Sequence, residues 1–328
     1  MAHKHIHSTK LLPDSEVTNY KALCGGLAWA AINTRPDIGF DTSWLASKGP
    51  TANGSDVAFG NKIQRRLKTT PSDLKFFKIS TDLKDWSFVA FHDAGFATRP
   101  SLHSQTGALI FVADKKVQDG KQANCMLVDW LCSRIDRVVR SSFEAEINSA
   151  QSTLDQLEFV HAMLTLILKG CTLKEYREMK DREEANLVGD NKGVYTAVQA
   201  CNPITTKGEK RLTIDKMLMK DHLRDFRVKY MWTNAGHQLA DALTKLSTAG
   251  ARLDLLLAVI EQGVLRITYS EVSGRREAKE NYQKKKQQVT TQEEEADQMF
   301  ALDQNDSPED RIPQDQEADS WDKYHYDL

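Results

Sequence analysis

In the stretch WSFVAFHD (residues 86–93), the largely apolar run 86–91 leads directly into His92 and Asp93. Aromatic and β-branched residues are enriched in strands, so this run is predicted to be a buried strand with Asp93 at its end. His92 and Asp93 are neighbours, and their side chains are expected to point to opposite faces of the strand. We therefore interpret Asp93 as a candidate functional residue and His92 as a structural one.

Other strand-like and helix-like segments lie around this run. The predicted strands are LKFFKI (74–79), TGALIFV (106–112), MLVDWL (126–131) with an extension at 137–140, ANLV (185–188) and VKYMW (228–232). The predicted helices run from Ser142 to about Leu168, from near Asn191, over about 214–226, and from Ala240 onward. Strands that first follow one another and then alternate with helices predict an α/β fold. We expect a mixed five-stranded sheet flanked by helices.

The chain is predicted to have four parts. Apolar spacing predicts helices over 20–32, from residue 38 to about 48, and over about 55–67, with a break at 34–37. We expect a small helical segment over 1–75, an α/β domain over 76–250 and a C-terminal helix over 251–270. Residues 271–328 contain 16 acidic and 8 basic residues with few aliphatic ones, which predicts a disordered acidic tail.

Composition excludes several classes of protein. The 328 residues are 40% hydrophobic and 27% charged, as in ordinary globular proteins. No apolar run approaches the roughly 18–20 residues that cross a bilayer, and the N-terminus lacks the apolar core of a secretory signal. We expect a soluble intracellular protein, cytoplasmic or nuclear, without a membrane partner. The five cysteines show no CxxC spacing, which argues against a disulfide framework and a zinc site.

Four carboxylates occupy positions from which a sheet could direct them into one cleft. Asp93 and Asp190 end apolar strands, Glu144 opens the long helix, and Asp241 follows a strand and a loop. Clustered acids repel one another, and their pKa values rise unless cations are present. Mg²⁺ prefers oxygen ligands, and two such ions can promote hydrolysis of a phosphodiester. The pattern therefore predicts a metal-dependent phosphodiesterase.

Five sequence blocks carry a resemblance to a known family. They are YKAL (20–23) with TRPDI (34–38), HDAGFA (92–97) with SQTG (104–107), Trp130 through SSFEAE (141–146), DNK (190–192) and QLADALTK (238–245). In this order they resemble the ribonuclease H segment of copia-type (Ty1/copia) retrotransposon Pol polyproteins, together with the end of the reverse transcriptase. The blocks span roughly 70% of the chain. The departures include Phe143 in place of the family's Thr, and the polymerase motif Tyr-x-Asp-Asp is absent.

The resemblance implies a ribonuclease H-like fold and an endoribonuclease that cleaves the RNA strand of RNA–DNA hybrids. It implies that Asp93, Glu144, Asp190 and Asp241 are catalytic and bind two Mg²⁺ ions, which Mn²⁺ can replace. Glu146 is the rival for Glu144, and His237 and Asn191 are accessory candidates. Residues 1–75 would be a remnant of the reverse transcriptase thumb or connection. Reverse transcriptase and integrase parts of the same polyprotein would be partners.

Two further interpretations stay open: a catalytically inactive nucleic-acid-binding remnant, and an accessory segment of a Pol polyprotein. Residues 1–270 carry a net charge of +6, which is compatible with a polyanionic partner. Lys and Arg contacts to phosphates would supply most of the affinity. The candidates for such contacts are Arg65, Arg66, Arg137, Arg140, Lys210 and Arg211. A solvated surface is the alternative explanation for each of them.

Overall fold

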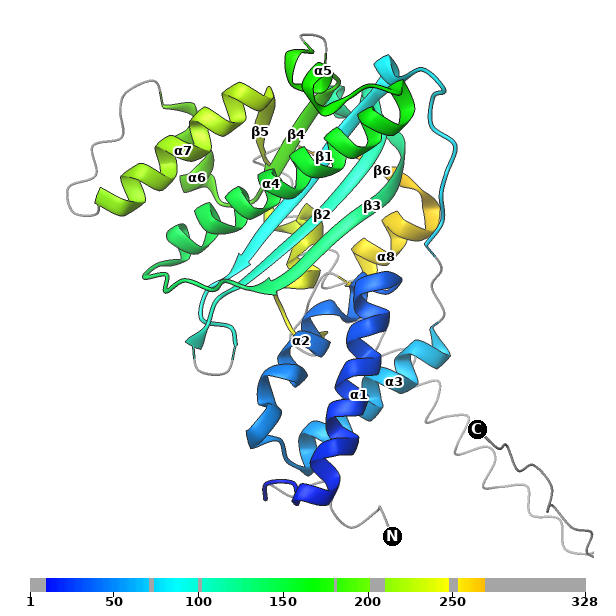
Figure 1. Ribbon diagram of the computed structural model, residues 1–328, viewed down its shortest axis with the longest axis vertical. Helices are drawn as coiled ribbons and strands as arrows, with labels where there is room; N and C mark the ends of the chain where they lie inside the picture. The colour runs from blue at the N-terminus through cyan, green and yellow to red at the C-terminus, as the bar shows by residue number, and fades with distance from the viewer. Residues whose placement is uncertain are drawn as a thin grey trace, which may run out of the picture. The chain divides into compact units, whose positions relative to one another are not determined.

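A mixed six-stranded sheet lies at the centre of the part of the chain that the structure describes (Figure 1). The structure is a computed structural model, and it describes residues 10–70, 74–99, 102–179, 182–200, 210–247 and 253–268. The spatial order of the strands is β5-β4-β1-β2-β3-β6. Their bounds are β1 Trp86–Gly95, β2 Gln105–Asp114, β3 Ala123–Arg134, β4 Glu184–Gly189, β5 Val228–Trp232 and β6 Val264–Leu265.

Strand pairing makes β1 the central strand. It pairs antiparallel with β2 and parallel with β4, while β2 pairs antiparallel with β3 and β4 pairs parallel with β5. Asp93 lies opposite Gly107 of β2. The carboxyl ends of the parallel strands β1 and β4 therefore meet at one edge of the sheet. The expected α/β class, with a mixed sheet flanked by helices, is confirmed.

Three details of the predicted sheet are wrong. The sheet has a sixth strand, the two-residue β6, which pairs with Ala123 and Asn124 of β3. Residues 74–79 form no strand, although Ile79 is buried in the core. The predicted strand extension at 137–140 is also irregular in structure.

Helices cover both faces of the sheet. On one face, α4 (Ser142–Lys169) and α7 (Lys210–Phe226) pack on a core that includes Phe88, Ile110 and Leu187 (Figure 1). The predicted helix from Ser142 to about Leu168 is present, and its apolar residues Ile147, Ala150, Leu154 and Leu157, which recur at helical spacing, are fully buried. On the other face lie the 3-10 helix η7 (Leu239–Leu243) and α8 (Leu253–Gln262). The short helices α5 (Leu173–Glu178) and α6 (Lys192–Gln199) flank β4.

The N-terminal helices form a small core of their own. They are α1 (Asp14–Asn33), α2 (Gly39–Lys48) and α3 (Gly54–Thr69), as the apolar spacing predicts. Their core contains Tyr20, Leu27, Leu45 and Ile63. The predicted break between the first two helices is the 3-10 helix η1 (Pro36–Ile38), where proline starts a tight turn.

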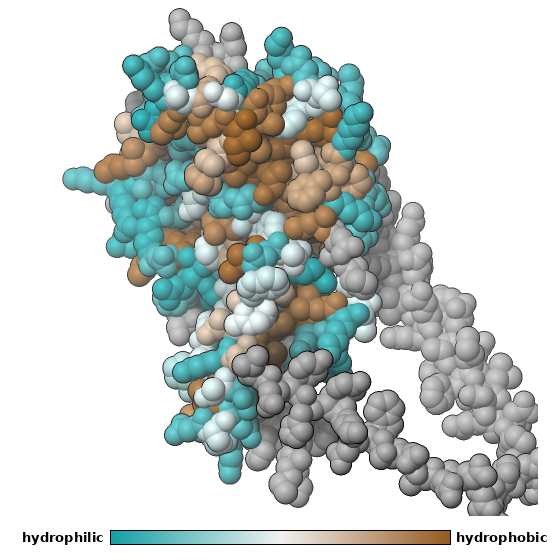
Figure 2. Space-filling view, turned by 45° about the vertical axis from the view of Figure 1, so that its right-hand side comes forward, coloured by the Kyte–Doolittle hydropathy of each residue, from teal (hydrophilic) through white to brown (hydrophobic). Residues whose placement is uncertain are grey.

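The outer face of α4 is also apolar. Phe159, Met163 and Ile167 recur every four residues on that face, and Phe159 and Ile167 are more than 60% exposed. Figure 2 shows apolar surface gathered on the upper part of one side of the molecule. Helix α4 therefore carries apolar residues on its buried and its exposed sides. Among the described residues, no helix combines the length and the apolar character that crossing a membrane requires.

Candidate active site

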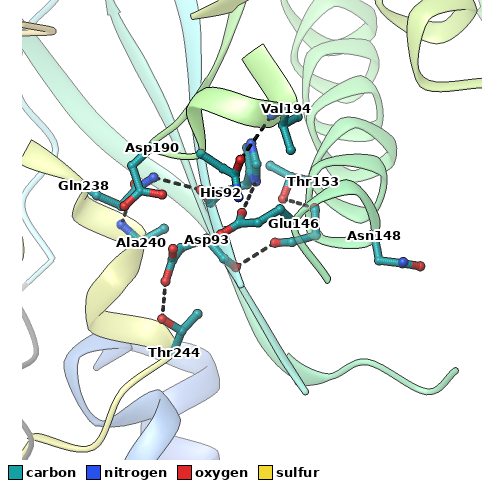
Figure 3. A network of polar contacts seen from close by, with 12 residues as sticks. His92, Asp93, Glu146, Asn148, Thr153, Asp190, Val194, Gln238, Ala240 and Thr244 are labelled. Carbon is teal, nitrogen blue, oxygen red and sulfur yellow. Dashed lines mark hydrogen bonds and ion pairs between the residues drawn. The ribbon is translucent and has the colours of Figure 1, made fainter. Parts of the chain in front are cut away.

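Three carboxylates from three different elements meet at the carboxyl ends of β1 and β4. Asp93 lies near the end of β1, Glu146 in the second turn of α4, and Asp190 directly after β4 (Figure 3). Each offers a carboxylate oxygen, and the three oxygens lie within 4.8 Å of one another. We refer to these residues as the three-carboxylate cluster.

Small residues make room for this arrangement. A side chain at Gly189, the last residue of β4, would collide with the His92 ring and the Tyr230 hydroxyl. A side chain at Gly107 would meet Leu243 and the backbone of Ala240, which belong to η7. The missing side chains thus allow β4 to approach the His92–Tyr230 pair and allow η7 to pack on the strand opposite Asp93.

The fourth predicted carboxylate, Asp241, lies in η7 beside the cluster but outside the group of three. It forms an ion pair with Lys245, and the hydroxyl of Thr244 donates a hydrogen bond to the Asp93 carboxylate. The QLADALTK block therefore contributes a carboxylate, a hydroxyl and a cation to the same place. Sequence reasoning identified this block but assigned no role to Thr244 or Lys245.

Burial and mutual repulsion disfavour the charged forms of these acids. Burial, followed by the charge of Asp190, raises the pKa of Asp93 to about 7, although the Thr244 hydrogen bond opposes this. Burial and the charges of Asp93 and Asp190 raise the pKa of Glu146. Burial and Asp241 raise the pKa of Asp190. Burial alone would lower the pKa of Lys245, but the surrounding carboxylates outweigh it and raise that pKa.

His92 borders the cluster as a neutral ring. It is completely buried, and burial lowers its pKa to about 3. Its Nε2 shares a hydrogen bond with the Tyr230 hydroxyl at 2.8 Å, and its Nδ1 lies 3.6 Å from Glu146 Oε2. Because the ring is neutral, this second contact is not an ion pair. Neither His92 Nδ1 nor Glu146 Oε2 has a hydrogen-bond partner among the described residues.

The donor set fits a hard divalent cation. All ligands offered are carboxylate oxygens, which Mg²⁺ and Mn²⁺ prefer. The unsatisfied Glu146 Oε2 is a buried acceptor that such an ion could satisfy. A bound cation would also relieve the repulsion that raises the three pKa values.

Glu144, the preferred sequence candidate, points elsewhere. Its carboxylate accepts the backbone N–H of Arg140 at 2.7 Å, and its own N–H is capped by the Ser141 hydroxyl at 3.1 Å. Glu144 thus fastens the start of α4 to the preceding loop. Its position does not support a ligand role, and Glu146, the rival candidate, takes its place in the site that we propose. The two residues are about 200° apart around the helix, which accounts for the difference.

Comparisons with known proteins agree with the sequence resemblance. Two curated relatives, both from Arabidopsis thaliana, are described as retrovirus-related Pol polyproteins from transposons RE2 and RE1. The first is 25% identical over 242 residues, which are 73% of this chain and 15% of the relative. The second is 25% identical over 233 residues, which are 70% of this chain and 14% of the relative. The chain is a homologue of retrotransposon Pol polyproteins. It spans about 15% of the length of these curated relatives.

Two solved ribonuclease H structures also match this Pol homologue. One is an RNase H1 isolated from compost, with 12% identity and a TM-score of 0.32 over 48% of this chain and 91% of that chain. The other is an N-terminal RNase H domain from Mycobacterium tuberculosis, with 17% identity and a TM-score of 0.31 over 54% and 97%. No family model matches the chain. The mixed sheet with helices on both faces agrees with the α/β class that the sequence predicted.

The accessory candidates of this Pol homologue have different surroundings. Asn191 caps α6, because its side-chain oxygen accepts the N–H of Val194 at 3.1 Å. His237 is half-buried at the end of the 3-10 helix η6 (Ala235–His237), and it is not among the residues of the three-carboxylate cluster. Gln238 is fully buried and donates a hydrogen bond to the His92 carbonyl at 2.9 Å. Gln238 therefore joins η7 to β1 next to Asp93, a role that the sequence did not reveal.

The basic candidates fall into two groups. Arg66 lies 3.3 Å from the Asp41 carboxylate, and Arg137 contacts the Asp215 carboxylate at 2.9 Å. These two arginines have carboxylate partners within the protein. The candidates whose side chains are exposed are Arg65, Arg140, Lys210 and Arg211.

Proposed function

We propose that this Pol homologue is a metal-dependent ribonuclease H that hydrolyses the RNA strand of RNA–DNA hybrids. The observation that supports the proposal best is the convergence of Asp93, Glu146 and Asp190 within 4.8 Å. The order of the motifs and the Pol relatives support the choice of substrate. The products would be a 3′-hydroxyl and a 5′-phosphate.

The residues of the cluster would hold two divalent ions, with Asp241 completing the set. When bound, such ions would supply positive charge to the phosphate, make water more acidic and stabilise the leaving oxygen. Thr244 holds one oxygen of Asp93 through its hydroxyl, and Lys245 balances the charge of Asp241. His92 lies beside Glu146 and adds no charge there, because it is neutral.

The hybrid would be held mainly through its phosphates. A-form-like helices expose 2′-hydroxyls in a wide minor groove, so shape and backbone would be recognised more than sequence. Arg65, Arg140, Lys210 and Arg211 have the exposure that phosphate contacts require. Arg66 and Arg137 are weaker candidates, because they are already paired with carboxylates.

Cleavage of an end-labelled RNA–DNA hybrid by the purified chain tests the proposal. We expect cleavage with Mg²⁺ or Mn²⁺ and no cleavage with EDTA. Double-stranded RNA should not be cleaved under any of these conditions. Asp93→Asn should abolish cleavage, whereas Glu144→Gln should retain it, because Glu144 lies outside the cluster. Cleavage that persists in Asp93→Asn would refute the assignment of the site.

Two other roles are distinguishable by the same experiment. Tight binding of the hybrid without cleavage under any metal would favour an inactive nucleic-acid-binding remnant. Cleavage that begins only when a polymerase domain is added would favour an accessory segment of a Pol polyprotein. Reverse transcriptase and integrase parts are the proposed partners, and helices α1–α3 would be the end of the reverse transcriptase.

A further inference from the structure

Helix α2 contacts two loops that follow elements of the site in sequence: the loop after β1 and the loop after η7. After β1, the guanidinium of Arg99 donates hydrogen bonds to the carbonyl and hydroxyl oxygens of Ser43 at 2.7 and 2.6 Å. After η7, the backbone N–H of Ser247 donates to the Asp41 carboxylate at 2.9 Å. Both Arg99 and Asp41 are buried, at 8% and 2% exposure. The contacts themselves are partly buried, because Ser43 and Ser247 are half-exposed.

The second of these loops carries one group that contacts the cluster and one that contacts Asp241 beside it. Thr244, which bonds Asp93, lies three residues before Ser247, and Lys245, which pairs with Asp241, lies two residues before it. A shift of the Ser247 backbone would move both groups. The short segment from the end of η7 to Ser247 is thus held at Ser247 by the contact with Asp41.

Asp41 is itself held in place by the helical segment. Arg66 of α3 lies 3.3 Å from its second carboxylate oxygen, and the same guanidinium donates to the Asp37 carbonyl at 3.2 Å. Asp37 in turn receives two hydrogen bonds from Arg35, at 2.7 and 2.9 Å. The TRPDI block thus supports Asp41 through Arg66.

Close packing adds to these polar contacts. Gly39 begins α2, and an added side chain there would lie 3.1 Å from Cys132 of β3 and 3.6 Å from Leu243 of η7. The indole N–H of Trp130 in β3 donates to the Ala31 carbonyl in α1 at 2.8 Å. The N-terminal helices therefore pack tightly on the elements beside the cluster.

We propose that the N-terminal helical segment (α1–α3) helps to position the site, and that Asp41 is a positioning residue for Thr244 and Lys245. This inference rests on the proposed metal-dependent function of the same cluster. Asp41 acts by accepting the Ser247 N–H, so it sets the place of the loop without contacting the metal ligands. Groups that hydrogen-bond metal ligands directly typically contribute about 10- to 100-fold to affinity or activity, and Asp41 acts through such a group, Thr244.

The test measures Mn²⁺ binding by titration calorimetry and hydrogen exchange of the Ser247 amide, both without substrate. Asp41→Ala should weaken Mn²⁺ binding by about 10-fold, the lower end of that range, and expose the Ser247 amide to rapid exchange. Asp41→Asn should restore both, because its side-chain oxygen can still accept the N–H. Ser247→Pro removes the donor instead of the acceptor, and it should weaken Mn²⁺ binding in the same way.

Asp56→Ala is the matched control. Asp56 is also a buried acid of the helical segment. It accepts the Asn53 N–H at 2.9 Å in the capping box of α3, and this hydrogen bond does not involve Ser247. If Asp56→Ala weakens Mn²⁺ binding as much as Asp41→Ala does, or if Ser247→Pro binds Mn²⁺ normally, the proposal is overturned. A wild-type chain that binds Mn²⁺ but never cleaves a hybrid would instead refute the proposed function and leave this inference standing.

Discussion

Asp93→Asn should make the metal-free protein more stable at alkaline pH, although it removes a proposed ligand. Asp93 has its pKa raised from 3.8 to about 7 in the folded protein, mainly by burial and by Asp190. Between these values the folded state holds a proton that the unfolded state has lost. The stability contributed by this proton is fully present below about pH 4 and is lost as the pH rises through about 7.

The size of the effect follows from the same two values. One pKa unit corresponds to about 1.4 kcal/mol, so the full difference is worth about 4 kcal/mol at pH 8. Rearrangement and water entry around the ionised carboxylate reduce this, and we expect a gain of about 2–4 kcal/mol for the asparagine variant. The asparagine side chain retains an oxygen that can accept the Thr244 hydroxyl, so little hydrogen bonding is lost.

Urea unfolding with EDTA at pH 4, 6 and 8 measures the effect. The free energy of unfolding of Asp93→Asn minus that of the wild type should grow with pH and be near zero at pH 4. Glu144→Gln is the control, since it removes a carboxylate of the same region that lies outside the cluster. A difference that does not change between pH 4 and 8 would refute the reasoning. Excess Mg²⁺ should cancel the advantage of the variant, because the ion stabilises the wild type by mass action.

Three further outcomes are expected. Glu146→Gln should lower hybrid cleavage by roughly 100-fold or more, because losing a ligand should cost at least as much as losing a residue that only supports one. In the same assay, Glu144→Gln should stay within about 10-fold of the wild type. Gly189→Ala should destabilise the protein by about 1–3 kcal/mol in urea unfolding, because the added methyl group collides with the His92–Tyr230 pair, and an unchanged midpoint would contradict this packing. If Lys210 and Arg211 contact phosphates, replacing both by glutamine should reduce the slope of log affinity against log salt by about 1–2, whereas an unchanged slope would remove them from the interface.

The sequence predicted the elements that depend on their own residues. Helix α4 was predicted almost to its ends, because its inward positions Ile147, Ala150, Leu154 and Leu157 recur at helical spacing. The segment 74–79 has equally strand-like residues but pairs with no strand, and its own residues carry no signal of this, because pairing depends on parts of the chain far away in sequence. The two-residue β6 is too short to leave a periodic signal.

The candidate site was predictable where a carboxylate ends a strand. Asp93 and Asp190 are brought together because β1 and β4 are parallel neighbours, and their positions in the sequence already suggested this. The choice between Glu144 and Glu146 depended on the rotation of α4, which the motif alone does not reveal. A usable signal was present, since Ser149 and Thr153 lie three and seven residues after Glu146 and form a buried polar stripe with it. Ser149 donates to the Asp93 carbonyl at 2.7 Å, which shows that this stripe faces the end of β1.

The charge balance of the site links its stability to its proposed chemistry. Four carboxylates lie in or beside the cluster, and among the described residues near them Lys245 supplies a positive charge while His92 is neutral. One lysine cannot neutralise four acids, so the metal-free site must take up protons, as the raised pKa values of Asp93, Glu146 and Asp190 indicate. Divalent cations would therefore compete with protons for the same oxygens. The fold thus keeps an arrangement that is costly without a cation, which is the physical reason to regard the cluster as a binding site and not as part of the scaffold.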